Sequence, residues 1–233
     1  MKQLHVLSAG AAKGLVLAMQ ESFASNAAAE LRCTFGAVGA IRDELLGGKR
    51  CDVVILTAAV IDALAAVGEI GAGIRASLGR VYTAIAVPEA QAAPDVATAE
   101  GLRDALLSAS GIYLPDPLRA TAGIHFAGVL RTLGIYEEVQ SRLRPFPSGA
   151  VAMRMMADAG EYNAIGCTQV TEIRYTVGVA LAGLLPREFE LATAYAVAVG
   201  RRAEEPALAT QFAAALAGSG SLALRREGGF IVD

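Results

Sequence analysis

The stretch HVLSAGAAKGLVLAMQ, His5–Gln20, joins a strand pattern to a helix pattern through small residues. An aliphatic run leads into Ser8-Ala9-Gly10-Ala11, and apolar side chains then recur at helical spacing. A single turn needs only one glycine, whereas a run of small side chains leaves the backbone N–H groups of a helix start open to an approaching group. The stretch therefore predicts a strand-to-helix joint that can receive a ligand.

The rest of the chain repeats this alternation of short β-branched runs and helical patterns. Strands are expected at residues 3–8, 31–35, 51–57, 80–87, 111–115, 163–167 and 190–199. Helices over 204–217 and 220–226 and a last strand, GFIVD, are expected to end the chain. Such alternation is typical of βαβ units, so the predicted fold class is α/β with parallel-rich sheets flanked by helices.

Two of these strands differ from the others because they alternate over a long span and look exposed. Residues 80–87 (RVYTAIAV) and 190–199 (ELATAYAVAV) are each flanked by a proline-containing loop. We interpret them as two crossings between lobes. The predicted lobes are residues 1–83 plus 194–233, and residues 84–193.

Composition narrows the functional classes. The formal net charge is −3 and no Lys/Arg run interleaves with aromatic residues, so nucleic acid is not expected as a partner. Charged residues or glycine interrupt every apolar run before the ~18 residues of a membrane span, so membrane insertion is not expected. No export signal precedes the first strand in MKQLHVL, which predicts a cytoplasmic protein as written, or a periplasmic one if an export signal has been removed.

Cysteine and histidine usage favours neither metal nor cofactor. The three cysteines, Cys33, Cys51 and Cys167, are an odd number in apolar runs, which indicates buried free thiols in a reducing compartment. The alternative is that Cys167 faces a ligand with its pKa lowered by a helix N-terminus, although no histidine base lies nearby in the sequence. His5 and His125, the only histidines, have no further ligand at metal spacing.

Six strand-to-helix joints are built from small or hydroxyl residues. They are residues 8–11, 36–40, 57–59, 121–123, 148–150 and 168–169. Helix N-termini at the carboxyl edge of a parallel sheet offer unpaired N–H donors and a positive dipole end, which suits a small anion. The candidate ligand-binding residues are Ser8, Ala9, Gly10, Ala11, Gly36, Val38, Gly39, Thr57, Arg119, Thr121, Ala122, Ser148, Gly149, Thr168 and Gln169.

Five stretches, in this order, carry a family resemblance that covers nearly the whole chain. They are VLSAGAAKGL, FGAVGAIRDELLGGKRCDVVILT, LPDPLRATAGIHFAGVLRTLGI, AIGCTQVTEI and ALATQFAAALAGSGSLALRREGGFIVD. The chain resembles a type II periplasmic binding protein of the molybdate/tungstate-binding branch. The resemblance implies two α/β lobes joined by two crossing strands, with a small anion held in the cleft between them by hydroxyls and N–H groups. It also implies an ABC permease as partner if the chain is exported.

The sequence departs from the oxyanion-binding pattern of that branch. Ala11 stands where the pattern has a ligand-binding serine, Gly36-Ala37-Val38-Gly39 replaces a serine-rich joint, and Cys167 falls near a frequent tyrosine. Lys13 and Arg119 lie at helix starts, where either side chain can reach a carboxylate. The departures favour an organic carboxylate over molybdate.

Three functions stay open. The first is binding of a small anion, an organic carboxylate, without changing it. The second is a cytosolic isomerase of a polycarboxylate, because aconitate isomerase resembles the same branch; Asp116 and Glu172 are then the acidic candidates for the base. The third is the molybdate/tungstate-binding component of an ABC transporter. Fold alone does not decide among them.

Overall fold

The computed structural model describes residues 2–27 and 29–232, and the chain has a mixed α/β fold. It divides into two compact units: unit 1 is Met1–Val81 with Thr193–Asp233, and unit 2 is Tyr82–Ala192. The chain leaves unit 1 within strand β4 (Ile70–Pro88) and returns at the start of β9 (Ala192–Gly200). The expected lobe boundaries fall within the same two strands, and the assignment of the units as two lobes stays a prediction.

Unit 1 has a sheet with strand order β2-β1-β3-β9. The remaining strand bounds are β1 (Lys2–Ala9), β2 (Ala29–Gly36) and β3 (Val53–Thr57). Strands β1, β2 and β3 are parallel, and β9 is antiparallel to β3. The carboxyl ends of the three parallel strands therefore lie at one edge of this sheet.

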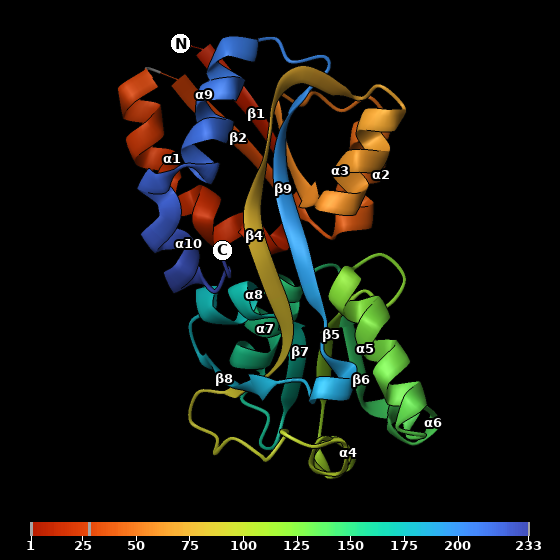
Figure 1. The fold of residues 1–233 in the computed structure, drawn as a ribbon. Coiled ribbons are helices and arrows are strands. Elements are labelled where there is room, and N and C mark those ends of the chain that lie inside the picture. Colours follow the sequence, from red (N-terminus) through yellow and green to blue (C-terminus); the bar gives the residue numbers. More distant parts are fainter. Residues whose placement is uncertain (1, 28, 233) are drawn as a thin grey trace. The chain divides into compact units, whose positions relative to one another are not determined.

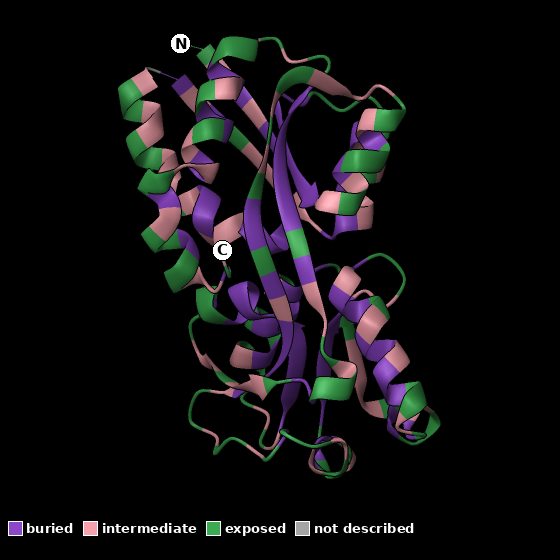
Figure 2. Ribbon diagram, in the orientation of Figure 1, coloured by how far each residue is buried: buried purple, intermediate pink, exposed green. Residues whose placement is uncertain are grey.

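Helices cover both faces of the unit 1 sheet. Their bounds are η1 (Gly10–Ala12), α1 (Lys13–Ala27), α2 (Val38–Leu46), α3 (Ala58–Ala66), α9 (Pro206–Ala217), η4 (Ser219–Ser221) and α10 (Leu222–Gly228). Figure 1 shows α1, α9 and α10 on one side of the strands and α2 and α3 on the other. Strand β3 is buried at every residue, because it is covered on both faces (Figure 2).

The C-terminal helices are held by one buried arginine. Arg225, which is 4% exposed, donates to the carbonyls of Leu78, Ala217 and Gly218 and to the hydroxyl of Ser221. Burial lowers the pKa of its guanidinium. Arg225 therefore ties α9 and α10 to the first part of β4.

Unit 2 has strands in the order β4-β7-β5-β6, with β8 paired to the other side of β4. The bounds are β5 (Ile112–Pro115), β6 (Leu143–Phe146), β7 (Ile165–Gln169) and β8 (Val179–Leu184). Strands β5, β6 and β7 are parallel, so their carboxyl ends also share one edge.

Helices flank this second sheet as well. They are α4 (Ala99–Ser108), α5 (Thr121–Thr132), α6 (Tyr136–Val139), η2 (Gln140–Arg142), α7 (Gly149–Ala159), α8 (Val170–Tyr175) and η3 (Arg187–Phe189). Phe126 and Leu102, from α5 and α4, are fully buried in one apolar core with Ile165 of β7. On the other face, Met153 of α7 packs so closely on Gly166 that a Cβ there would overlap with it.

The sequence-based prediction of α/β alternation is confirmed, with four corrections. Strands β6 and β8 were not predicted, and β4 begins at Ile70 instead of residue 80. The segments 80–87 and 190–199, expected to be exposed, are mostly buried. The expected last strand over 229–233 is an isolated bridge between Arg80 and Ile231, and Asp233 lies outside the described residues.

In the described part of the chain, no single helix is long and apolar enough to cross a membrane. One bent pair, Pro206–Ala217 with Ser219–Gly228, passes the same test of length and composition.

Candidate functional site

The carboxyl edge of unit 1 brings together three of the predicted joints. Ala9 at the end of β1 pairs in register with Gly36 at the end of β2, and Ser8 pairs with Ile55 of β3. Each strand passes directly into a helix: η1 and then α1 after β1, α2 after β2, and α3 after β3. The joints 8–11, 36–40 and 57–59 therefore lie side by side within this unit.

These helix starts are bare. Among the described residues, no side chain caps the helices that follow Ala9, Ala37 and Thr57. The first N–H groups of a helix have no partner inside the helix, and its positive dipole end faces the same way. Three helices thus begin at one edge of the sheet, and their first N–H groups have no side-chain cap. This arrangement favours the binding of a small anion.

Polar side chains at this edge are few. Ser8 is fully buried, and its hydroxyl donates to the Ala9 carbonyl at 2.9 Å, so it is turned to the backbone. Ala11 is 4% exposed and Val38 9%. The ammonium of Lys13 lies 5.8 Å from the centroid of the Phe35 ring, at the start of α1. Backbone groups, with Thr57 and Lys13 nearby, are thus the polar groups of the described residues at this edge.

In unit 2, helix α5 also begins without a side-chain cap among the described residues, after Ala120. Thr121 and Ala122 form its first turn, and Arg119 is exposed just before it. The close approach of this turn to β5 needs Gly123, because a Cβ there would overlap with the carbonyls of Pro115 and Asp116. This start resembles those of unit 1, with a cation beside it.

Asp116 has a structural role at the same turn. Its Oδ1 accepts the N–H of Leu118 at 2.7 Å, and its carbonyl accepts the N–H of Ala120 at 3.0 Å. This is the geometry of an Asx turn, which forms the loop that positions Arg119.

The start of α7 is different, because protein side chains occupy it. The Ser148 hydroxyl caps the helix by accepting the N–H of Val151 at 3.3 Å. The Glu172 carboxylate accepts the N–H of Ala150 at 3.1 Å and the hydroxyl of Thr168 at 2.5 Å. Glu172 is 6% exposed and Thr168 is fully buried. The predicted residues Ser148, Gly149 and Thr168 thus meet around a carboxylate.

Gln169 and Thr171 add polar atoms at the end of β7. The amide nitrogen of Gln169, a residue that is 2% exposed, donates to the Thr83 hydroxyl at 3.4 Å. Its Oε1 and the hydroxyl of Thr171 are buried and find no hydrogen-bond partner among the described residues. Buried polar atoms are paired in most proteins, so these two mark the strand end as unusual.

The alternative in which Cys167 is a reactive thiol is wrong for this fold. Cys167 is fully buried in the apolar core of unit 2, and burial raises its pKa well above the usual range. Burial also raises the pKa of Cys33 to about 11 and that of Cys51 to about 12. The three thiols are free, as predicted, and Cys51 and Cys167 are buried; the prediction of burial is wrong for Cys33, which is only partly buried. His125 is engaged with the Phe189 carbonyl at 2.7 Å.

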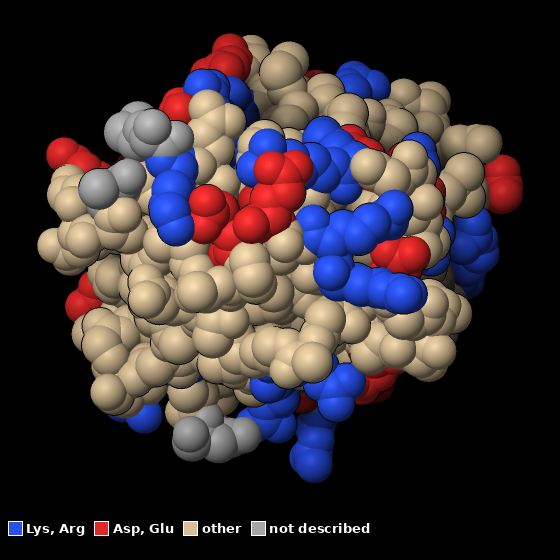
Figure 3. All heavy atoms as spheres, turned by 90° about the horizontal axis from the view of Figure 1, so that it is seen from above, with Lys and Arg blue, Asp and Glu red and all other residues tan. Residues whose placement is uncertain are grey.

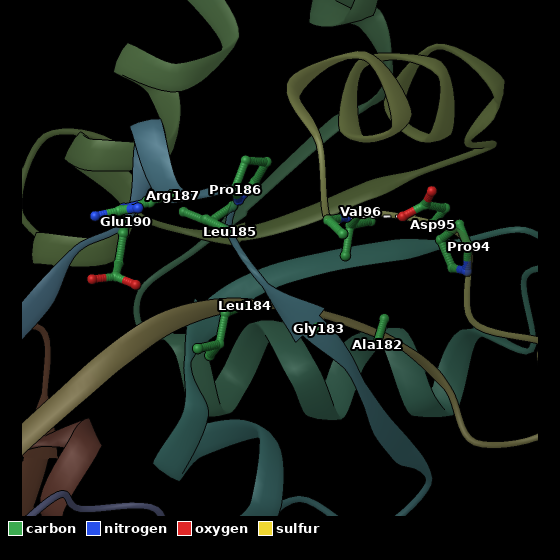
Figure 4. A pocket seen from close by; sticks show the side chains of 11 residues that line it. Pro94, Asp95, Val96, Ala182, Gly183, Leu184, Leu185, Pro186, Arg187 and Glu190 are labelled. Carbon is green, nitrogen blue, oxygen red and sulfur yellow. Dashed lines mark hydrogen bonds between the residues drawn. The ribbon is translucent and has the colours of Figure 1, made fainter.

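A groove of about 530 Å³ opens elsewhere on unit 2, between the loop before α4 and the end of β8 (Figure 4). Its walls are the segments 94–97 and 182–187 with Glu190. Asp95 turns its carboxylate to the N–H of Ala97 at 2.9 Å. None of the predicted ligand-binding residues lines this groove.

The amino edge of the unit 1 sheet is charged and tightly paired. Buried Asp52 accepts the N–H groups of His5 and Glu204, both at 2.7 Å, and so fastens β1 to the loop after β9. Around it, acidic and basic side chains form pairs: Lys2–Glu205, Arg50–Glu204, Arg202–Glu69 and Lys49–Glu44. The face seen in Figure 3 shows both signs interspersed.

No group of three or more His, Cys, Asp or Glu side chains within residues 2–27 and 29–232 is placed to hold a metal ion.

The chain belongs to a family of solute-binding proteins. The family model described as bacterial extracellular solute-binding protein matches residues 4–231. The architecture of type II periplasmic binding proteins, predicted from the sequence, is confirmed by the solved structures that follow.

Solved structures with the same fold bind different solutes. The periplasmic molybdate-binding protein of Azotobacter vinelandii matches with a TM-score of 0.80 and 18% identity, over 99% of both chains. The sulfate-binding protein SubI from Mycobacterium tuberculosis H37Rv matches with a TM-score of 0.72 and 16% identity, over 99% of this chain and 86% of that one.

A curated enzyme is also similar. Aconitate isomerase from Pseudomonas sp is 24% identical over 171 residues, which is 72% of this chain and 62% of that protein. The matched part is thus less than two thirds of the length of that relative.

Proposed function

We propose that this chain binds a small organic carboxylate. One observation carries the proposal: the helix starts at the carboxyl edge of unit 1, after Ala9, Ala37 and Thr57, have no side-chain cap among the described residues. A carboxylate oxygen accepts such N–H groups directly, and charge-assisted hydrogen bonds are about twice as strong as neutral ones.

Two cations support a carboxylate. Lys13 lies at the start of α1, and Arg119 lies just before the bare start of α5 in unit 2. A guanidinium binds a carboxylate with two parallel hydrogen bonds. Hydroxyl-bearing side chains are scarce at the unit 1 joints, where Ala11 and Val38 stand. An organic carboxylate therefore fits better than molybdate.

The family description, bacterial extracellular solute-binding protein, supports a role as an extracellular solute receptor. We propose that such a receptor delivers its ligand to a membrane permease. On this proposal the protein works outside the cytoplasmic membrane. The nearest alternative to carboxylate binding is binding of molybdate or tungstate.

Thermal unfolding in the presence of candidate ligands tests the proposal. A ligand at one hundred times its Kd adds about 2.7 kcal/mol to the free energy of unfolding. We expect citrate, tricarballylate or a related di- or tricarboxylate to raise Tm by several degrees. Stabilisation by molybdate, tungstate or sulfate with none by carboxylates would contradict the proposal.

A second candidate is isomerisation of a bound polycarboxylate by proton transfer. The similarity to aconitate isomerase favours it, together with the buried Glu172 carboxylate beside Thr168 at the end of β7. Backbone N–H groups aimed at developing negative charge stabilise an enolate-like state. Incubation with cis-aconitate in D₂O, followed by proton NMR, tests this function: a new isomer or deuterium at carbon supports it, and unchanged bound ligand contradicts it.

A further inference from the structure

The groove of unit 2 lies beside a strand edge that no other described strand covers. Strand β8 pairs with β4, and within residues 2–27 and 29–232 no strand pairs with its other side. Residues 182–186 line the groove in unbroken succession. Successive side chains of a strand point to opposite faces, so a groove that touches each of these residues lies beside the edge of the strand and not over one face. The backbone N–H and C=O groups that β8 does not direct to β4 therefore border this groove.

Strand β8 has few of the features that keep a second strand away from a sheet edge. Proteins commonly protect such an edge with charged side chains, prolines or bulges. The strand reads VALAGL and has neither a charge nor a proline, and its side chains Leu181 and Leu184 are 37% and 41% exposed. It does have a bulge, because Ala182 has no counterpart on β4. A bulge bends the edge, so backbone pairing here is short and a contact needs side chains as well.

Side chains of opposite charge lie at the two ends of the groove, as Figure 4 shows. Asp95 lies at one end, near Ala182, and Arg187 lies at the other, after the end of β8. Both are exposed, and neither forms an ion pair with another residue in the described part of the chain. Asp95 Oδ1 accepts the Ala97 N–H, which leaves its second oxygen for a cation. The Glu190 carboxylate points away from the Arg187 guanidinium (Figure 4).

An antiparallel pair of β8 edges brings these ends together. When a strand pairs antiparallel with the same strand of a second copy, the two run in opposite directions and a two-fold axis relates them. The Asp95 end of each groove then lies at the Arg187 end of the other, so both contacts form at once. Leu184, between the charged ends, loses exposure to water against the second copy. The surface is thus complementary to itself, as a two-fold interface requires.

We propose that this chain forms a two-fold homodimer through the β8 edge of unit 2, in which Asp95 of each copy pairs with Arg187 of the other. None of the candidate ligand-binding residues lines the groove, so the inference goes beyond the proposed function and does not depend on the ligand. The backbone contact is short, and exposed ion pairs add little each. The dimer is therefore weak and forms at high protein concentration.

Charge reversal tests the pairing most sharply. Arg187→Glu sets two acidic side chains against each other in the homodimer, and Asp95→Lys sets two cations against each other. Sedimentation equilibrium of the full chain over a range of concentrations measures the Kd of the dimer. We expect each variant alone to raise this Kd by at least about tenfold. An equal mixture of the two variants should regain the wild-type Kd within about threefold, because both contacts of the mixed dimer join opposite charges.

A second variant tests the strand edge independently of the turn that Asp95 makes. Leu184→Lys places two like charges near the two-fold axis and should abolish the dimer. Leu46→Lys in unit 1, where Leu46 is 50% exposed, is its control. Arg103→Glu is the control for charge reversal, because Arg103 lies in α4 outside the groove, 3.8 Å from Asp104. Both controls should leave the dimer Kd unchanged.

Circular dichroism checks that each variant is folded, and if Asp95→Lys is not, Arg187→Glu and Leu184→Lys carry the test. A wild type that stays monomeric at its highest soluble concentration would overturn the inference. Variants of Arg187 and Leu184 that dimerise as wild type does, a mixture no better associated than its two components, or losses of the same size in the controls would also overturn it. A dimer whose Kd rises in the variants and is regained in the mixture supports it.

Discussion

Units 1 and 2 differ in the side chains that lie at the start of a helix after a parallel strand. Helix α2 of unit 1 begins after Ala37 with no side-chain cap in the described part of the chain, whereas α7 of unit 2 begins with the Ser148 hydroxyl and the Glu172 carboxylate in place. Both helices follow a parallel strand and carry the same backbone dipole. The difference lies in the side chains at the two starts, not in the fold.

On the proposed function, a bare helix start can receive a ligand anion, whereas a start that holds a protein carboxylate offers fewer donors. Substitutions at strand ends would then alter ligand preference without changing the sheet.

The largest effect is expected from filling the space that unit 2 keeps for Glu172. Gly149→Ala should lower the free energy of unfolding by about 3 kcal/mol, because its Cβ overlaps with Thr168 and Glu172 and displaces the cap. Urea titration measures the change. Gly128→Ala, in α5, is the control: a Cβ there meets nothing within 4 Å, so this variant should be stabilised by up to about 1 kcal/mol. Equal stability of both variants would mean that the carboxylate is not fixed at α7.

The next largest effect, on carboxylate affinity, is expected from placing an acidic side chain at the start of α2 in unit 1, as Glu172 lies at the start of α7 in unit 2. Ala37→Asp places a carboxylate at the N-cap of α2 and should weaken carboxylate binding by about 2 kcal/mol, roughly thirtyfold, through like-charge repulsion. Ala37→Asn caps the helix without charge and controls for the cap itself. Calorimetry on both variants measures the difference. Unchanged affinity in the aspartate variant would show that the ligand does not use this helix start.

A smaller effect is expected at the cation beside α5. Arg119→Ala should weaken carboxylate binding by about 1.4 kcal/mol, about tenfold, because one charge-assisted pair is lost. Arg103→Ala in α4, where Arg103 lies 3.8 Å from Asp104, is the matched surface control. If both variants bind equally well, Arg119 has no role in recognition.

The three cysteine thiols should not react rapidly with a disulfide reagent in the native protein. The pKa of Cys33 is about 11, so only about one molecule in a thousand carries the reactive thiolate at pH 8, and Cys51 and Cys167 are more deeply buried. Reactivity should rise with pH toward that value. Absorbance with a disulfide reagent should report no rapid reaction at pH 8, and three thiols in denaturant. Rapid native labelling of Cys167 at pH 8 would contradict the burial of β7 in the unit 2 core.

Much of the fold could be predicted from sequence because its central strands are rich in β-branched residues. Strand β3 is VVILT and is buried throughout. The two missed strands are both edge strands: among the described residues, β6 pairs with β5 alone and β8 with β4 alone. An edge strand needs fewer apolar residues and tolerates Pro145, so its pattern is weak.

The candidate site was predictable only where its parts are local. The small-residue joints at 8–11 and 36–40 are visible in the sequence, and so is Glu172 one turn after Thr168. One partner of Glu172 is the Ala150 N–H, 22 residues earlier, on a different helix. That contact depends on the packing of α7 against α8, for which no local pattern exists.

The central claim is that a carboxylate is bound by backbone N–H groups of unit 1, and amide NMR tests it most directly. In a ¹⁵N-labelled sample titrated with the best carboxylate of the thermal screen, the largest downfield amide-proton shifts should fall on Gly10, Gly39 and Ala58, with Ala150 changed little because Glu172 already accepts its N–H. The largest shifts at Ala150 and Val151, with none at the three unit 1 joints, would contradict the account.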